Sequence, residues 1–181
     1  FSVFNDFDKY LILSYLFKKN YLHYSELFEV KSFEEYYSLP FIELEKFNLI
    51  EISKELRISK ETARRKILEL EEIGIIKKNE KIVNLNLKEV NTKRNIRTIQ
   101  SFSRILSSIS KILFKNNVVN KEYDKYFFEN EIKDKFTQIW GIFLEYQIDY
   151  ILNRKAIMND DLELFFILGV LIYNQNLSVS P

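Results

Sequence analysis

The sequence has no cysteine, a single histidine (His23), three glycines and two prolines among its 181 residues. Without cysteine there is no disulfide, no thiolate ligand for zinc and no thiol redox chemistry. A Cys–His nucleophile system cannot be built either, and His23 is expected at the surface or at the edge of the core. The scarcity of glycine and proline favours helices joined by short polar loops over a many-stranded sandwich.

Other catalytic signatures are also missing. There is no glycine-rich phosphate loop, no Gly-x-Ser-x-Gly sequence and no zinc-binding spacing. The one tight acidic cluster consists of Asp160, Asp161 and Glu163, and we expect it to cap a helix rather than to bind a cation. The sequence therefore predicts a protein that is not an enzyme and has no cofactor or metal.

The apolar runs are short. The longest, Leu164 to Tyr173, has about ten residues, whereas a helix that crosses a bilayer needs roughly 20. The first eight residues are interrupted by Asn5, Asp6 and Asp8, unlike the apolar part of a secretory signal. These features predict a buried helix at 164–173, no membrane partner and a cytoplasmic location.

What the sequence does have is a large apolar and aromatic content. Hydrophobic residues make up 46% of the chain, with 16 Phe and 11 Tyr, which is enough to fill a core. Apolar residues at helical spacing predict a first helix over about 6–20. Residues 21–47, around Pro40, are expected to form a short helix and a loop.

Charge is unevenly distributed along the chain. Residues 1–52 contain five basic and nine acidic residues, whereas residues 53–97 contain thirteen basic and seven acidic ones. A basic segment between more acidic flanks favours a polyanion partner at that segment. Basic segments of this size also occur in proteins that never bind nucleic acid, so the charge alone does not decide the function.

Two helices with a short turn between them are predicted in the basic segment. Asn48 is a helix-capping residue with Glu51 three positions later, as in a capping box, and Leu49 and Ile52 begin an apolar face. Ser59 is a second capping residue.

The second predicted helix covers 60–73. Its apolar positions are Ala63, Ile67, Leu70 and Ile73. Gly74 follows as the left-handed residue that ends many helices. Residues 75–86 then place β-branched residues on both sides of a polar tip at 78–81, which predicts a two-stranded hairpin.

The rest of the chain again has a helical pattern. An apolar stripe predicts a long amphipathic helix that ends near Asn116 and Asn117; it consists of Ile96, Ile99, Phe102, Ile105, Ile109 and Ile112 or Leu113. Residues 121–176 are expected to form two or three further helices, with breaks near Asn130, 153–161 and Asn174.

The stretch from Ile52 to Ile76, ISKELRISKETARRKILELEEIGII, resembles the DNA-binding core of bacterial winged-helix transcriptional regulators, the group that contains MarR-like, GntR-like and Crp-like proteins. The most specific part is Ser-x-x-Thr-Ala-Arg-Arg-x-Ile-x-x-Leu-x-x-x-Gly-Ile, from Ser59 to Ile75. The resemblance implies a mainly α fold: a winged helix-turn-helix, with a three-helix core and a two-stranded β-hairpin wing, followed by additional C-terminal helices. The subfamily is left open.

By this resemblance the helix 60–73 would enter the major groove of double-stranded DNA and the hairpin 75–86 would be the wing. The expected DNA-binding residues are Ser59, Lys60, Glu61, Thr62, Arg64, Arg65, Lys77, Lys78 and Lys81. Arg65 and Thr62 are the leading candidates for base contacts, and Arg64 and Lys60 for phosphate contacts, because Arg can bond guanine in a bidentate way and Thr can contact thymine. Lys88, Lys93, Arg94 and Arg97 could extend the phosphate contacts, but solvation of the long helix is favoured.

The expected organisation is a DNA-binding domain at 1–90 and a helical domain at 91–181 for dimerisation. Aromatic residues of the second domain could line an effector pocket, although plain core is favoured; they are Trp140, Phe143, Tyr146, Tyr150, Phe165, Phe166 and Tyr173. The predicted function is a homodimeric DNA-binding transcriptional regulator. The alternatives are a winged-helix module for protein–protein assembly and a plasmid or phage replication initiator.

Overall fold

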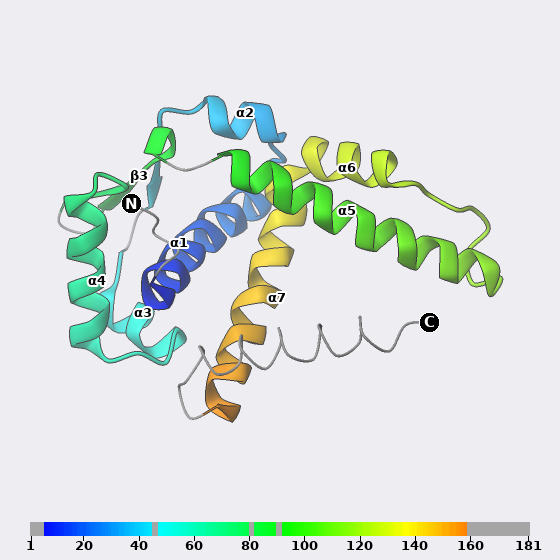
Figure 1. Ribbon diagram of the computed structural model, residues 1–181. Helices are drawn as coiled ribbons and strands as arrows, with labels where there is room; N and C mark the ends of the chain where they lie inside the picture. The colour runs from blue at the N-terminus through cyan, green and yellow to red at the C-terminus, as the bar shows by residue number, and fades with distance from the viewer. Residues whose placement is uncertain (1–5, 45–46, 80–81, 90–91, 159–181) are drawn as a thin grey trace.

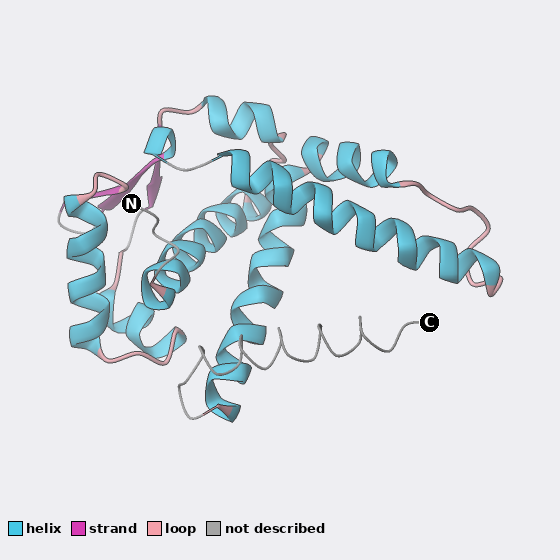
Figure 2. Ribbon diagram, viewed as in Figure 1, coloured by secondary structure: helices cyan, strands magenta, loops and turns pink. Residues whose placement is uncertain are grey.

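The computed structural model describes residues 6–44, 47–79, 82–89 and 92–158. Over these residues the protein is mainly α-helical with one small antiparallel sheet (Figures 1 and 2). The predicted mainly α fold class is therefore confirmed. The elements are α1 (Phe7–Glu26), α2 (Phe33–Ser38), β1 (Phe41–Leu44), α3 (Leu49–Glu55), α4 (Lys60–Glu72), β2 (Ile76–Asn79), β3 (Ile82–Asn86), the 3-10 helix η2 (Leu87–Glu89), α5 (Thr92–Lys115), α6 (Lys125–Asp134) and α7 (Phe136–Ile157).

Helix α1 is the central element, with α7 packed along it and α4 against its other side (Figure 1). It begins where the carboxylate of Asp6 accepts a hydrogen bond from the N–H of Lys9, 3.1 Å away. It ends at Glu26, six residues later than the sequence predicts. Gly141 favours the close packing of α7, because a Cβ atom there would lie 3.2 Å from Cβ of Tyr21, nearer than in most such contacts.

The buried aromatic residues meet where α1, α2 and α7 converge. The rings of Tyr21 and Tyr36 lie 5.0 Å apart, and Phe136 stands edge-on to Tyr21 at 5.7 Å. The hydroxyl of Tyr36 donates to Asn20 Oδ1 at 2.9 Å, so this buried polar group is satisfied. Burial raises the pKa of both tyrosines, and they stay neutral.

The sheet has three strands in the order β1-β3-β2, both pairs antiparallel. Val83 of β3 lies opposite Leu44 of β1 and Lys78 of β2, and Val83 and Leu85 point into the core. The predicted hairpin is confirmed as β2 and β3. The short helix expected within 21–47 is α2, but the loop expected there is wrong in part, because it contains the strand β1. Strand β1 escaped prediction because it has four residues, too few for its alternation of exposed and buried positions to stand out.

The long C-terminal helix is confirmed as α5, and the chain turns at Asn117, which has a φ of 56°. The break predicted near Asn130 is wrong, because Asn130 lies inside α6 and the break falls at Lys135. The acidic cluster at 160–163, the apolar run 164–173 and the break near Asn174 lie outside the described residues. Among the described helices, none combines the length and the hydropathy needed to span a bilayer.

Candidate nucleic-acid interface

The turn between α3 and α4 is fixed by local hydrogen bonds. Asn48 starts α3 by accepting from the N–H groups of Ile50 and Glu51, at 3.0 and 3.4 Å. Within the turn, the hydroxyl of Ser53 donates to the carbonyl of Ile58 at 2.7 Å. Arg57 has a φ of 52°, a left-handed conformation that is costly for a residue with a Cβ. The turn therefore joins the two helices in one defined geometry.

The capping box predicted for α3 forms only in part. The backbone of Glu51 is capped by Asn48, but its carboxylate accepts a hydrogen bond from the Tyr15 hydroxyl at 2.8 Å and pairs with Lys19. Hydrogen bonds from Lys19 and Tyr15 hold the pKa of Glu51 below its usual value. The Glu51 side chain therefore joins α3 to α1. Both helices lie within the predicted DNA-binding domain.

Helix α4 has the ends that the sequence predicts. The hydroxyl of Ser59 accepts from the N–H of Thr62 at 2.9 Å and donates to the Thr62 hydroxyl at 2.8 Å. At the other end Gly74 has a φ of 76°, its N–H donates to Glu71, and the N–H of Ile75 donates to Leu70. This is the paired hydrogen-bond pattern of a Schellman motif, and it directs the chain into β2.

The predicted site residues of α4 lie on its solvent-facing side. Its buried face consists of Ala63, Ile67 and Leu70. At 3.6 residues per turn, Arg65 lies about 165° and Arg64 about 95° around the axis from the centre of that face. Lys60, Glu61, Arg64 and Arg65 are exposed, as is Ser59 before the helix, and Thr62 is half-buried. Arg65 is thus at the centre of the exposed face and Arg64 at its flank.

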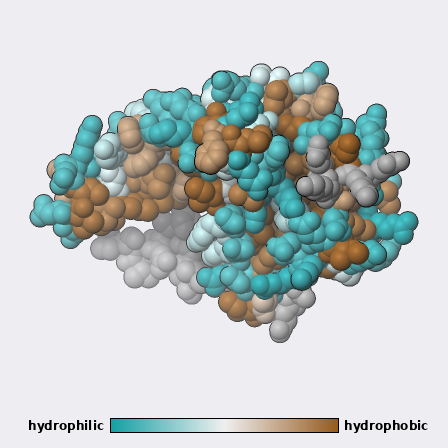
Figure 3. All heavy atoms as spheres, turned by 180° about the vertical axis from the view of Figure 1, so that it is seen from behind, coloured by the Kyte–Doolittle hydropathy of each residue, from teal (hydrophilic) through white to brown (hydrophobic). Residues whose placement is uncertain are grey.

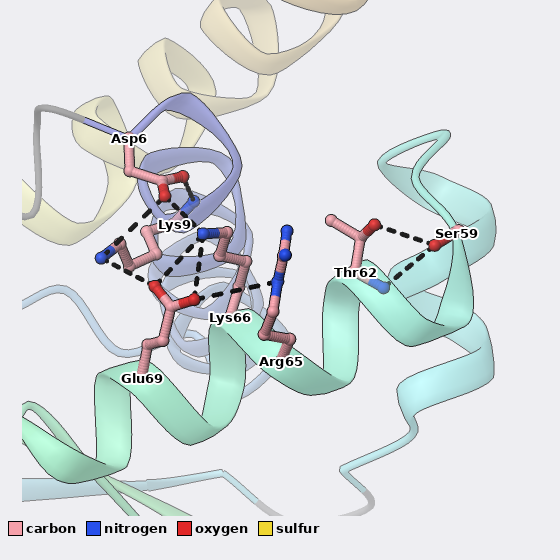
Figure 4. A network of polar contacts seen from close by, with 7 residues as sticks. All are labelled: Asp6, Lys9, Ser59, Thr62, Arg65, Lys66 and Glu69. Carbon is pink, nitrogen blue, oxygen red and sulfur yellow. Dashed lines mark hydrogen bonds and ion pairs between the residues drawn. The ribbon is translucent and has the colours of Figure 1, made fainter.

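An ion-pair network joins α4 to the start of α1 (Figure 4). The ammonium of Lys66 lies 2.6 Å from Asp6 and 3.0 Å from Glu69, and the ammonium of Lys9 lies 2.9 Å from Glu69. The Lys66 side chain is only 12% exposed. Arg65 reaches the outer end of this network, with its Nε 3.9 Å from Glu69. The network therefore fixes the rotation of α4 about its own axis.

The charges of the network stabilise one another. Burial alone would raise the pKa of Asp6, but hydrogen bonds from Lys66 and from the N–H of Lys9 outweigh it and lower the pKa. Hydrogen bonds from Lys9 and Lys66 lower the pKa of Glu69. Burial alone would lower the pKa of Lys66, but its hydrogen bonds to Asp6 and Glu69 raise it. All three groups are charged at neutral pH.

The hairpin lysines differ in their surroundings. Lys77 is exposed on β2. The N–H of Lys78 donates to the Glu71 carboxylate of α4 at 2.9 Å, and its ammonium lies 5.2 Å from the centre of the Phe47 ring. Lys81 lies outside the described residues. Of the three lysines, Lys77 therefore offers a charge at the surface, while Lys78 is directed back onto the protein.

Sequence reasoning missed two basic residues beside the predicted site. Lys54 at the end of α3 and Arg57 in the turn are both exposed, close in sequence to Lys60. Within the described part of the chain, neither forms an ion pair. The available signal was their place in the turn, since that is where the chain approaches the exposed end of α4.

Of the aromatic residues expected to form plain core or a pocket, Trp140 is buried and Phe143 is partly buried. Trp140 and Phe143 line a cleft of about 130 Å³ between α1, α5 and α7, whereas Tyr146 and Tyr150 are exposed. Phe165, Phe166 and Tyr173 lie outside the described residues. A larger cleft, of about 450 Å³, lies between α1, β1 and α3, and His23 is on its wall. Across residues 6–44, 47–79, 82–89 and 92–158, no three His, Asp or Glu side chains gather as a metal site.

Comparisons with protein-family models, with curated proteins and with solved structures gave no match. A function for this chain has to be argued from its own residues.

Proposed function

We propose that the chain is a DNA-binding transcriptional regulator of the winged helix-turn-helix type. The element order supports this fold: α1, β1, α3 and α4 are followed by the hairpin β2–β3, and β1 pairs with β3. In such a fold α1, α3 and α4 are the three-helix core and β2–β3 is the wing. Helix α2 is then an addition between α1 and β1.

One observation carries the proposal. Helix α4 is capped at both ends, held by a buried apolar face, and tied to α1 by the Asp6–Lys66 ion pair. Its opposite face is left to the solvent, with Arg65 64% exposed at its centre. A rigid helix with an outward-facing basic residue fits the major groove of double-stranded DNA.

The residues of this face have distinct proposed roles. Arg65 makes bidentate bonds to guanine, and Glu61, on the same side of α4, accepts from the amino group of cytosine. Arg64 and Lys60 contact phosphates from the flank, together with Arg57 and Lys54. Ser59 and Thr62 reach the backbone or a thymine methyl, and Lys77 contacts phosphate from the wing.

A homodimer is part of this proposal, because one short helix reads few base pairs and two half-sites a helical turn apart give more specificity. The exposed apolar residues Ile105, Ile109 and Ile112 on α5 support a subunit contact in the C-terminal half. A small-molecule effector would have the cleft beside Trp140 and Phe143 as its site.

The test compares parent protein with the double variant Arg64→Ala/Arg65→Ala on fragments selected from genomic DNA. The variant should lose its preference for the selected fragment over unrelated duplex, and the slope of log affinity against log salt should become shallower by up to about 2. Lys133→Gln/Lys135→Gln is the matched control, because Lys133 of α6 and Lys135 directly after it are already paired with Glu129 and Glu131. Equal selectivity of parent and double variant overturns the proposal.

A second candidate function is a protein–protein assembly module of the same fold. Leu68 favours it, because this leucine lies on the outer side of α4 and is 49% exposed. The two functions separate at low salt: an assembly module shows no affinity for mixed genomic duplex, and a DNA-binding protein does.

A further inference from the structure

Helix α5 carries only one sign of charge. Its 24 residues include no Asp or Glu, but they include Lys93, Arg94, Arg97, Arg104, Lys111 and Lys115. This helix lies in the half of the chain to which the proposed function assigns only dimerisation and effector binding. Its charge is therefore not explained by the α4 interface.

Five of these residues form a straight ridge. At 3.6 residues per turn, the Cα–Cβ directions of Lys93, Arg97, Arg104, Lys111 and Lys115 fall within about 40° of one another around the axis. All five side chains are exposed. At a rise of 1.5 Å per residue, the ridge is about 33 Å long. We call these five residues the α5 ridge.

The charges of the α5 ridge have no ion-pair partner among the residues that the structure describes. Lysines elsewhere do find partners, as Lys133 does with Glu129 in the neighbouring α6 at 2.8 Å. The ridge is therefore a row of like charges that a polyanion would neutralise.

The residues between the basic side chains suit a sugar-phosphate backbone. Gln100, Ser101 and Ser107 lie along the same side of α5 and can donate hydrogen bonds to phosphate oxygens, whereas the hydroxyl of Ser108 already donates to the carbonyl of Arg104. Of the aromatic residues of α5, only Phe114 lies beside this side, at its end, and one ring is not the row of stacking platforms that a single strand uses. The length of about 33 Å matches one turn of duplex DNA, which is about 34 Å.

The α5 ridge is not part of the α4 interface. Helix α4 lies at one edge of the molecule, and α5 extends from the middle toward the opposite edge (Figure 1). A short duplex lying against α4 would not run along α5. We propose that the α5 ridge binds the backbone of a second segment of double-stranded DNA, without sequence preference; the choice of DNA as the polyanion rests on the function proposed above.

An anionic membrane surface is the competing partner. The exposed apolar residues Ile105, Ile109 and Ile112 would have to enter the bilayer, and they follow one another on a separate side of α5, roughly 100° around the axis from the ridge. Apolar surface beside hydrophilic surface is visible on the left of Figure 3, where the far end of α5 in Figure 1 lies. A helix in a membrane interface also has its basic and apolar rows on different sides, so this angle alone does not separate the two partners. The proposed function assigns the apolar row to the subunit contact, and a basic row without apolar residues fits a polyanion better than a bilayer.

The experiment uses the full chain and two duplexes. One duplex carries the selected site and is attached to beads, and the other is fluorescent and unrelated in sequence. The ridge variant is Arg97→Gln/Arg104→Gln/Lys111→Gln/Lys115→Gln, which keeps good helix formers at exposed positions. Lys133→Gln/Lys135→Gln is again the charge control, and an unchanged unfolding midpoint establishes that each variant is folded.

The parent protein and the control should carry the fluorescent duplex to the beads at low salt. The ridge variant should still bind the selected site with its sequence preference, but should retain less than about a tenth of the fluorescent duplex. Its slope of log affinity for unrelated duplex against log salt should be shallower by about 3 to 4, since each lost phosphate contact removes about 0.9. Undiminished retention by the ridge variant overturns the inference.

Two further arms separate the possible failures. Arg64→Ala/Arg65→Ala should lose its sequence preference. Its affinity for unrelated duplex should keep the parent's slope against log salt, because the α5 ridge is intact. A failure of the α4 proposal is therefore seen independently of the ridge. Vesicles of phosphatidylglycerol and phosphatidylcholine test the membrane. Binding of the parent to these vesicles that the ridge variant loses, with no retention of the second duplex by either protein, also overturns the inference.

Discussion

The carboxylate of Asp6, at the start of α1, lies 2.6 Å from the ammonium of Lys66 in the middle of α4. Lys66 directly follows Arg65 in the chain, about 100° further around the axis of α4, and its side chain reaches α1 (Figure 4). A contact on this side of the helix resists rotation about its axis. The orientation of the Arg65 side chain therefore depends on the Asp6–Lys66 ion pair, which lies on another side of α4.

The energy of this pair can be measured by a double-mutant cycle with Asp6→Asn and Lys66→Met. Asparagine keeps an oxygen that can accept from the Lys9 N–H, so the cap of α1 is retained while the charge is removed. We expect each single variant to lower the free energy of unfolding by about 1 kcal/mol, with a coupling energy of about 0.5–1 kcal/mol. Urea unfolding of the four proteins checks this, and zero coupling would mean that the two side chains act independently.

The pH dependence of stability follows from the same network. The pKa values of Asp6 and Glu69 are lower in the folded protein than their usual values. The stabilisation by each carboxylate is therefore complete above its unfolded pKa, about 4, and is lost as pH falls through the lower folded pKa. Urea midpoints of the parent should fall between pH 5 and pH 3 more steeply than those of Asp6→Asn/Glu69→Gln. Parallel curves for the two proteins would contradict this assignment.

Gly74 should be sensitive to substitution for a backbone reason alone. Its φ is 76°, and a Cβ atom there would meet no heavy atom within 4 Å. Gly74→Ala should therefore lower the free energy of unfolding by about 1–2 kcal/mol, because alanine is unfavourable in the left-handed conformation. A clash of the new Cβ with neighbouring atoms should not contribute. Gly74→Asn should cost less, because asparagine tolerates this conformation better. Thermal or urea unfolding compares the two, and an equal loss for both would point to a different cause.

The sequence predicts the ends of α3 and α4 well because their signals are local. Asn48, Ser59 and Gly74 each act through hydrogen bonds to residues at most four positions away, or through their own φ. No property of the rest of the fold is needed to recognise such residues. This is why the position of the candidate site in the chain could be predicted.

Features that depend on distant partners could not be predicted. Strand β1 exists because Ile42 and Leu44 pair with β3, about 40 residues later, and its four residues carry no sufficient pattern of their own. The contact of Asp6 with Lys66 likewise joins residues that are 60 positions apart. Neither the spacing nor the composition of a single sequence contains this information.

The apolar stripe of α5 shows a third limit. Its period correctly predicts a helix, but Ile105, Ile109 and Ile112 are 57, 45 and 60% exposed. The side of α5 that packs on the protein is rotated away from them and includes Ile99 and the small residues Ser103 and Ser110. A hydrophobic pattern therefore predicted the element, whereas the face that is buried is decided by the helices that pack against it.

Arg57 combines backbone strain with an exposed positive charge, and the two should separate by mutation. At a φ of 52°, arginine costs about 1–2 kcal/mol relative to glycine, part of which is offset by the greater freedom of glycine in the unfolded chain. Arg57→Gly should therefore raise the free energy of unfolding by up to about 1 kcal/mol. If Arg57 contacts phosphate, the same variant should bind DNA more weakly, with a salt slope shallower by about 1.

Arg57→Asn is the matched control, because asparagine tolerates the left-handed conformation but carries no charge. It should show the same loss in DNA affinity with a smaller gain in stability. Urea unfolding and duplex titrations at several salt concentrations measure both effects. A gain in stability without any change in DNA affinity would mean that Arg57 does not contact phosphate. A loss of stability would contradict the argument that arginine is strained at this φ. A strained residue persists where its side chain is needed, so opposite changes in stability and in binding would explain why the turn has arginine at a position that suits glycine.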